Sequence, residues 1–97
     1  MYVIMAFDKP DSAQLRLDTR PAHIDYVLSR GSIIAGGPFM SEDGETMIGS
    51  LVVLDVASHA EAQAFATDDP YNKAGLFEKI EIRRWNHIIG GLPDISA

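Results

Sequence analysis

The chain has 97 residues, of which 46% are hydrophobic and 23% are charged, and its net charge is −6. About 100 residues suffice for one domain with one modest core, so we expect residues 1–97 to form a single domain. This composition excludes an intrinsically disordered chain. The negative charge argues against nucleic acid as a partner, because phosphate binding needs a basic surface. No apolar run approaches the roughly 20 residues of a membrane span, so we expect no membrane partner.

The chain contains no cysteine. A disulfide framework, a thiolate zinc site and a cysteine nucleophile are therefore excluded, and the absence of thiols is consistent with a cytoplasmic location. The three histidines, at positions 23, 59 and 87, match no metal-binding spacing, and the sequence has no phosphate-binding glycine loop. We therefore expect neither a metal nor another cofactor.

The first half of the chain predicts a strand followed by a long helical stretch. Residues 2–7 are apolar and end at a Lys-Pro break, which is typical of a short buried strand. Residues 11–30 follow helical periodicity, and Gly31 suits the left-handed position after a helix. Pro21 lies inside this stretch, so either the helix kinks there or a new helix begins at that proline.

A hairpin and a second helix come next. Residues 32–39 and 47–56 read as two strands joined by a polar loop with a turn signal. Ser58 and Glu61 form the pattern of a capping box, which predicts a helix start. Asp69-Pro70 ends that helix, because a residue before proline avoids the helical region. A short helical turn is expected within residues 70–77, and residues 78–89 alternate as the last strand.

The predicted order is β-α-β-β-α-β, the ferredoxin-like arrangement of an α+β protein. It places both helices on one face of a four-stranded antiparallel sheet. Several strands, above all residues 47–54, are apolar on both faces. The face without helices therefore needs a cover, and we expect a homodimer that packs sheet on sheet.

The first helix carries an anomaly. On a helical wheel its polar residues lie between two apolar flanks, in the middle of the face that should be buried. The stripe consists of Arg16, Arg20, His23, Val27 and Arg30, and the flanks of Leu15, Ala22, Tyr26, Leu17, Ile24 and Leu28. We expect both flanks to face the core. Either the stripe reaches a wet edge of the sheet, or a polar pocket with His23 at its centre separates helix and sheet.

Two further candidate sites each have two interpretations. Asp69 is suited to cap a short helix that begins at Pro70, or to hold the imidazole of His23 so that His23 can act as a general base. Gly36, Gly37 and Pro38 are typical of a strand bulge, or of a segment where a small ligand approaches the backbone. Trp85 is expected in the core or at an interface.

The sequence resembles the YciI-like, or YCII-related, family. The residues that carry the resemblance are Arg20 to His23, Gly36 to Pro38, and the helix that leads into Asp69-Pro70-Tyr71. The resemblance implies a ferredoxin-like fold in dimers of the α+β barrel type and a histidine-aspartate active site at His23 and Asp69. Some relatives are linked to dehydrochlorination of chlorinated hydroxyquinols, and the wider superfamily includes muconolactone isomerase and small monooxygenases.

Our first hypothesis is a small cofactor-independent enzyme that runs elimination or isomerisation. His23 would be its acid and base, oriented by Asp69, while Arg20, the Gly36–Pro38 segment and Tyr71 would bind a small anionic or aromatic substrate. The alternatives are a dimeric binding module without turnover and an accessory subunit. Cofactor-free oxidation of an aromatic compound also stays open. The segment 86–97 is either a tail that crosses to a partner or a frayed end.

Overall fold

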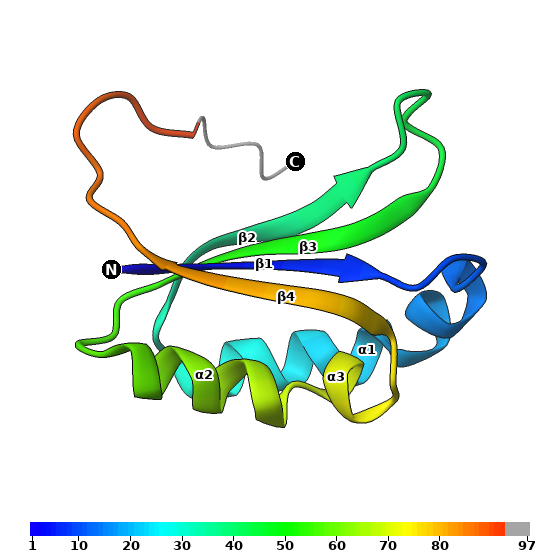
Figure 1. Cartoon of the computed structure of the whole chain (residues 1–97), viewed down its shortest axis with the longest axis horizontal. Coiled ribbons are helices and arrows are strands. Elements are labelled where there is room, and N and C mark those ends of the chain that lie inside the picture. The colour runs from blue at the N-terminus through cyan, green and yellow to red at the C-terminus, as the bar shows by residue number, and fades with distance from the viewer. Residues whose placement is uncertain (93–97) are drawn as a thin grey trace.

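The computed structural model describes residues 1–92, so the end of the predicted tail, residues 93–97, lies outside the described part. Figure 1 shows one curved sheet with all helices on one face. The elements are β1 (Tyr2–Asp8), α1 (Ala13–Arg30), β2 (Ile33–Met40), β3 (Met47–Leu54), α2 (His59–Asp68), α3 (Pro70–Lys73) and β4 (Phe77–Arg84). This order confirms the predicted β-α-β-β-α-β arrangement, with the expected short turn after Asp69 present as α3.

The sheet has the strand order β2-β3-β1-β4, and its three strand pairs are antiparallel. β1 lies in the interior, with Ile4 opposite Val52 of β3 on one side and Ile82 of β4 on the other. These three side chains are buried and belong to the main core cluster. Because successive side chains of a strand point to opposite faces of the sheet, these three lie on the face that the helices cover. The core is therefore built on the helix side of the sheet.

α2 covers one half of that face tightly. Ala62, Phe65 and Ala66 are its buried residues, and they pack into the core cluster. The capping box forms as expected at the serine, because Ser58 Oγ accepts a hydrogen bond from the Glu61 amide at 3.2 Å. The Glu61 carboxylate accepts from the amide of Ala57 at 3.0 Å, one residue earlier than in the usual pattern.

α1 is one helix from Ala13 to Arg30, with Pro21 inside it. A proline lacks an amide proton, so the carbonyl of Leu17 loses its helical partner. Leu17 is half exposed, so this turn of the helix lies at the surface. The helix ends as predicted at Gly31, whose φ of 70° lies in the left-handed region that favours glycine.

The expectation that both apolar flanks of α1 face the core was wrong. Leu17 and Leu28 are 52% and 68% exposed, and Arg16 is the buried residue of this helix. Of the other flank, Tyr26 packs against the core and donates a hydrogen bond to the Phe65 carbonyl at 2.7 Å. Arg16 takes the buried place that the flanks were expected to fill, and Ile24 and Leu28 border a cavity instead of packing into the core.

The last strand is shorter than predicted, since β4 ends at Arg84 rather than at residue 89. The Trp85 amide donates to the carbonyl of Met1, the residue that precedes β1, at 3.0 Å. Beyond this point, no strand among residues 1–92 lies opposite the chain that follows β4. His87 therefore lies outside the sheet and is exposed, and in Figure 1 the chain after β4 rises away from the sheet, on the side opposite the helices.

We call the sheet surface without helices the outer face. It forms, with the segment from Trp85 to Leu92, a largely apolar groove of about 810 Å³. Ile88, Ile89 and Leu92 of that segment are each more than 80% exposed. Among the described residues, no helix is both long and apolar enough to cross a membrane.

Candidate functional site

A cavity of about 230 Å³ lies between α1 and the sheet, on the half of the face that α2 does not cover. An engineered protein cavity of about 150 Å³ holds a benzene molecule, so this volume suits one six-membered ring with small substituents. The lining comes from α1, β2, β3 and α3: Arg16, Arg20, His23, Ile24, Val27, Leu28, Ile33, Gly36, Gly37, Pro38, Met47, Ser50, Val52 and Tyr71. Four residues of the α1 stripe, Arg16, Arg20, His23 and Val27, thus face a pocket, as the second interpretation of the sequence expected, whereas Arg30 does not line it and pairs with Asp68 instead.

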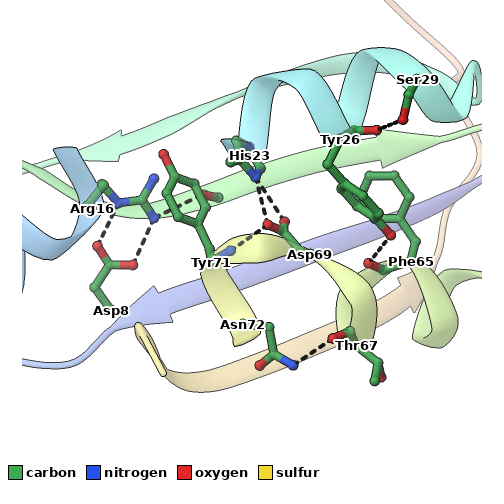
Figure 2. A network of polar contacts seen from close by, with 11 residues as sticks. Asp8, Arg16, His23, Tyr26, Ser29, Phe65, Thr67, Asp69, Tyr71 and Asn72 are labelled. Carbon is green, nitrogen blue, oxygen red and sulfur yellow. Dashed lines mark hydrogen bonds and ion pairs between the residues drawn. The ribbon is translucent and has the colours of Figure 1, made fainter. Parts of the chain in front are cut away.

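His23 and Asp69 meet at one end of this cavity. The His23 Nδ1 lies 2.9 Å from Oδ1 and 3.0 Å from Oδ2 of Asp69. Dashed lines mark both contacts in Figure 2. A carboxylate only accepts hydrogen bonds, so the shared proton belongs to Nδ1, and in the neutral form of the ring the second nitrogen, Nε2, then has a free lone pair. The two side chains are 14% and 6% exposed, which shelters the contact from water.

Asp69 also caps α3. Its Oδ1 accepts a hydrogen bond from the Tyr71 amide at 2.9 Å, while Pro70 occupies the first turn of the helix. The two interpretations of Asp69 are therefore not exclusive, since one carboxylate serves the cap and the imidazole. The hydrogen bond from the Tyr71 amide holds the Asp69 carboxylate in the position in which it also contacts His23.

Tyr71 stands between His23 and Arg16 (Figure 2). Its ring stacks on the His23 ring with centroids 4.1 Å apart, and the Arg16 guanidinium carbon lies 4.4 Å from the Tyr71 centroid. Tyr71 is 1% exposed and lines the cavity. Burial raises the pKa of Tyr71, and the nearby guanidinium groups of Arg16 and Arg20 act in the opposite direction. The phenol is therefore a neutral donor at ordinary pH.

Arg16 is locked by a second acidic residue. Its Nε donates to Asp8 Oδ2 at 2.7 Å and its Nη2 donates to Asp8 Oδ1 at 2.8 Å, which is a bidentate ion pair. Nη2 also donates to Ser50 Oγ at 2.9 Å. Burial acts to lower the pKa of Arg16, but the hydrogen bond and charge of Asp8 outweigh it and the pKa is raised. The guanidinium is a permanent cation in a fixed orientation.

The remaining predicted site residues reach the cavity in different ways. Arg20 is exposed, lines the cavity and forms no ion pair within residues 1–92. Gly36, Gly37 and Pro38 line it from β2, and the irregularities of β2 pairing lie on either side of them rather than within. A β-carbon on Gly36 would contact Ile33 and Val52, whereas one on Gly37 would meet open space.

Sequence reasoning did not include Asp8, Arg16 and Ser50 among the site residues. The helical wheel singled out Arg16 as a charge on the buried face, which was a usable signal. Asp8 ends a strand and Ser50 lies inside an apolar strand. Nothing in their spacing connects them with Arg16, because the contact depends on the packing of α1 over β1 and β3.

Within residues 1–92, no three histidine or acidic side chains lie close enough together to hold a metal ion. His59 is exposed on α2, and its ring meets the edge of the Tyr2 ring. The three histidines are thus in three separate surroundings.

Residues 1–86 match the YCII-related domain family. The chain belongs to this family. A curated relative, protein YciI of Escherichia coli, is 33% identical and aligns with 91% of this chain and 98% of its own length. The protein of the same name from Shigella flexneri matches equally well. The resemblance seen in the sequence is therefore confirmed.

Solved structures give the same fold. A 5-chloro-2-hydroxyhydroquinone dehydrochlorinase from Burkholderia phenoliruptrix, solved with 2,5-dihydroxybenzoquinone, is 34% identical, with a TM-score of 0.80. The match covers 89% of this chain and 93% of that chain. An antibiotic biosynthesis monooxygenase shares only the fold, at 7% identity and a TM-score of 0.57, with 91% and 97% of the two chains covered. The chain has the α+β fold of the dimeric α+β barrel proteins.

Proposed function

We propose that this YCII family member is a small enzyme that uses His23 and Asp69 for acid and base chemistry on a single-ring molecule with oxygen substituents. One observation carries the proposal: Asp69 holds Nδ1 of His23 while the ring borders a ring-sized cavity. A histidine held in this way has one nitrogen free to take and return a proton. The reaction class is elimination or isomerisation.

The related dehydrochlorinase supports the choice of a first substrate, 5-chloro-2-hydroxyhydroquinone. The chemistry needs no oxidant. His23 Nε2 takes a proton from a ring hydroxyl, and a proton returns to the ring carbon that bears chlorine. Chloride then leaves with the electron pair of the carbon–chlorine bond as a second hydroxyl loses its proton. The balance is the loss of HCl and the formation of a quinone.

The apolar wall of the cavity favours a ring, and the cations favour a negative charge on it. Ile24, Val27 and Val52 provide apolar contact area beside His23. Arg20 at the exposed rim would attract an anionic substrate by long-range charge, since no acidic side chain within residues 1–92 pairs with it. This arrangement suits a phenol, a quinol or an aromatic acid.

The test is chloride release from 5-chloro-2-hydroxyhydroquinone under anaerobic conditions, with a protein-free control. We expect His23→Gln to lower kcat/KM by about 10²–10⁴-fold, the usual contribution of a positioned acid or base. Asp69→Asn, which keeps an N-cap residue at α3, should lower it by a comparable amount because the imidazole loses its fixed tautomer. Wild-type protein that binds the compound without releasing chloride would support a binding module instead.

We also propose that a second copy of the chain covers the outer face in the cytoplasm. The exposed apolar side chains of this face lie together with Trp85, which is 41% exposed. A monomer rarely leaves such a surface to water. Light scattering should give twice the chain mass of 10.6 kDa, and Leu51→Lys, which charges the middle of the face, should give the single mass. A wild-type monomer would contradict this assignment.

A further inference from the structure

Two hydrogen-bond donors in the cavity have no acceptor among residues 1–92. Arg16 uses Nε and Nη2 for Asp8 and Ser50, and its third nitrogen, Nη1, has no hydrogen bond within residues 1–92. The Tyr71 hydroxyl has no acceptor for its own proton within residues 1–92, although its oxygen lies close enough to the Arg16 guanidinium for hydrogen bonding to lower the pKa of Tyr71, and the Tyr71 amide bonds Asp69. Both side chains are at least 98% buried. Unpaired donors in such surroundings are unusual and call for an explanation.

The two donors are not sealed inside the protein. Within the described residues, no fully enclosed side-chain nitrogen or oxygen lacks a hydrogen-bond partner. Nη1 of Arg16 and Oη of Tyr71 must therefore be reachable, and both residues line the cavity beside His23. The guanidinium also lies close enough to the phenol to act against the effect of burial on the pKa of Tyr71. The donors thus face the same space.

We propose that Arg16 Nη1 and Tyr71 Oη form an oxyanion subsite, which binds the oxygen of a ring substrate that becomes negatively charged when His23 removes its proton. The inference rests on the proposed function and deepens it, because it names the part of the site that stabilises the anion. Tyr71 and Arg16 are then catalytic residues in contact with substrate. His23 supplies the base, and the subsite holds the resulting phenolate or enolate.

The charge balance explains why such a subsite would favour the transition state over the bound substrate. Asp8 neutralises Arg16, so the pair carries no net charge although its free donor stays oriented. A group of this kind gains most when negative charge develops on the oxygen that it contacts. Asp8 and Ser50 fix two of the three guanidinium nitrogens, so little reorganisation is needed as the charge appears.

The test uses 4-nitrophenol, a single-ring phenol whose phenolate form absorbs visible light. We expect wild-type protein to bind the phenolate about tenfold or more tightly than the phenol, as hydrogen bonds to a charged oxygen allow. The titration of the bound probe then moves to lower pH by about one unit or more. Tyr71→Phe keeps the ring between Arg16 and His23 and should lose most of this shift.

Two variants separate the subsite from other causes. Tyr2→Phe removes a hydroxyl on the core side of β1, away from the cavity, and should behave as wild type. His23→Gln should keep the shift, since the subsite does not need the imidazole. A shift that His23→Gln abolishes and Tyr71→Phe preserves would overturn the inference, as would a wild-type protein that binds neither form. If the protein prefers the phenolate form of 4-nitrophenol but releases no chloride from 5-chloro-2-hydroxyhydroquinone, the subsite is supported and the proposed enzyme is contradicted.

Discussion

α1 brings two basic side chains to two carboxylates, and the pairs differ in what they leave free. The Asp8–Arg16 pair is bidentate, with side chains 5% and 2% exposed, and its guanidinium is a permanent cation. In the His23–Asp69 pair the histidine contributes one nitrogen, and its other nitrogen borders the cavity. The first pair fixes the orientation of the Arg16 guanidinium, whereas the second contains an imidazole, which can take up and release a proton. A base needs the second kind of arrangement, and a rigid anion site needs the first.

The largest expected difference between the two pairs is in the free energy of unfolding. Asp8→Asn leaves the buried guanidinium of Arg16 without a compensating charge, so we expect the free energy of unfolding to fall by about 3–5 kcal/mol. Asp69→Asn is the matched change in the other pair. Asparagine still caps α3, and the change leaves no permanent cation without its partner, so the loss should stay near or below about 1 kcal/mol. Urea denaturation measures both, and equal losses would break the distinction.

A second prediction concerns which face of β2 contacts the ligand. Gly36 pairs with Val52, which lines the cavity, and Gly37 pairs with Leu51, which lines the outer face. Gly36→Val should therefore project into the cavity and weaken binding of 2,5-dihydroxybenzoquinone by about tenfold, since pocket contacts of one or two methyl groups have effects of this order. Gly37 borders the cavity only through its backbone, and a side chain there would project into open space on the outer face, so Gly37→Val is the control and should weaken binding much less than Gly36→Val. If Gly37→Val weakened binding more than Gly36→Val, the ligand would lie on the outer face.

The smallest expected effect is on how folding stability changes at alkaline pH. Burial is the main cause that raises the pKa of Tyr71, so above the ordinary value of 10.0 the unfolded chain releases this proton before the folded one. The stability that depends on the neutral phenol is fully present below that pH and declines as the pH rises through the folded value. Tyr71→Phe should therefore decline less steeply. Tyr26, whose pKa is raised first of all by burial, adds a similar slope in both proteins. Identical slopes would contradict the assignment.

Local patterns were enough to predict the order of the elements. Hydrophobic periodicity, the Ser58 capping box and the proline after Asp69 are local signals, and each element they indicated is present. The end of β4 was missed because it depends on where β1 begins, which is a property of the register. The exposure of Leu28 was missed because the wheel does not show how far a helix stands from its sheet.

The site was predictable where a residue type was anomalous or matched a family motif. His23 and Asp69 were named from the sequence, and the structure brings them into contact. Arg16 was noticed as a charge on a buried face, but its partners Asp8 and Ser50 are 8 and 34 residues away and carry no pattern. Pairing between distant segments arises only when α1 packs across β1 and β3, so local chemistry could not indicate it.

The state of the His23 ring tests the central claim most directly. The contact with Asp69 requires the neutral ring to carry its proton on Nδ1 and to leave Nε2 unprotonated, and nitrogen-15 NMR of the histidine rings distinguishes these forms. The exposed rings of His59 and His87 serve as internal references. We predict one fixed tautomer, protonated on Nδ1, for His23 in the wild type and its loss in Asp69→Asn. A proton on Nε2, or the same averaged signal as the exposed histidines, would contradict the assignment of His23 as the base.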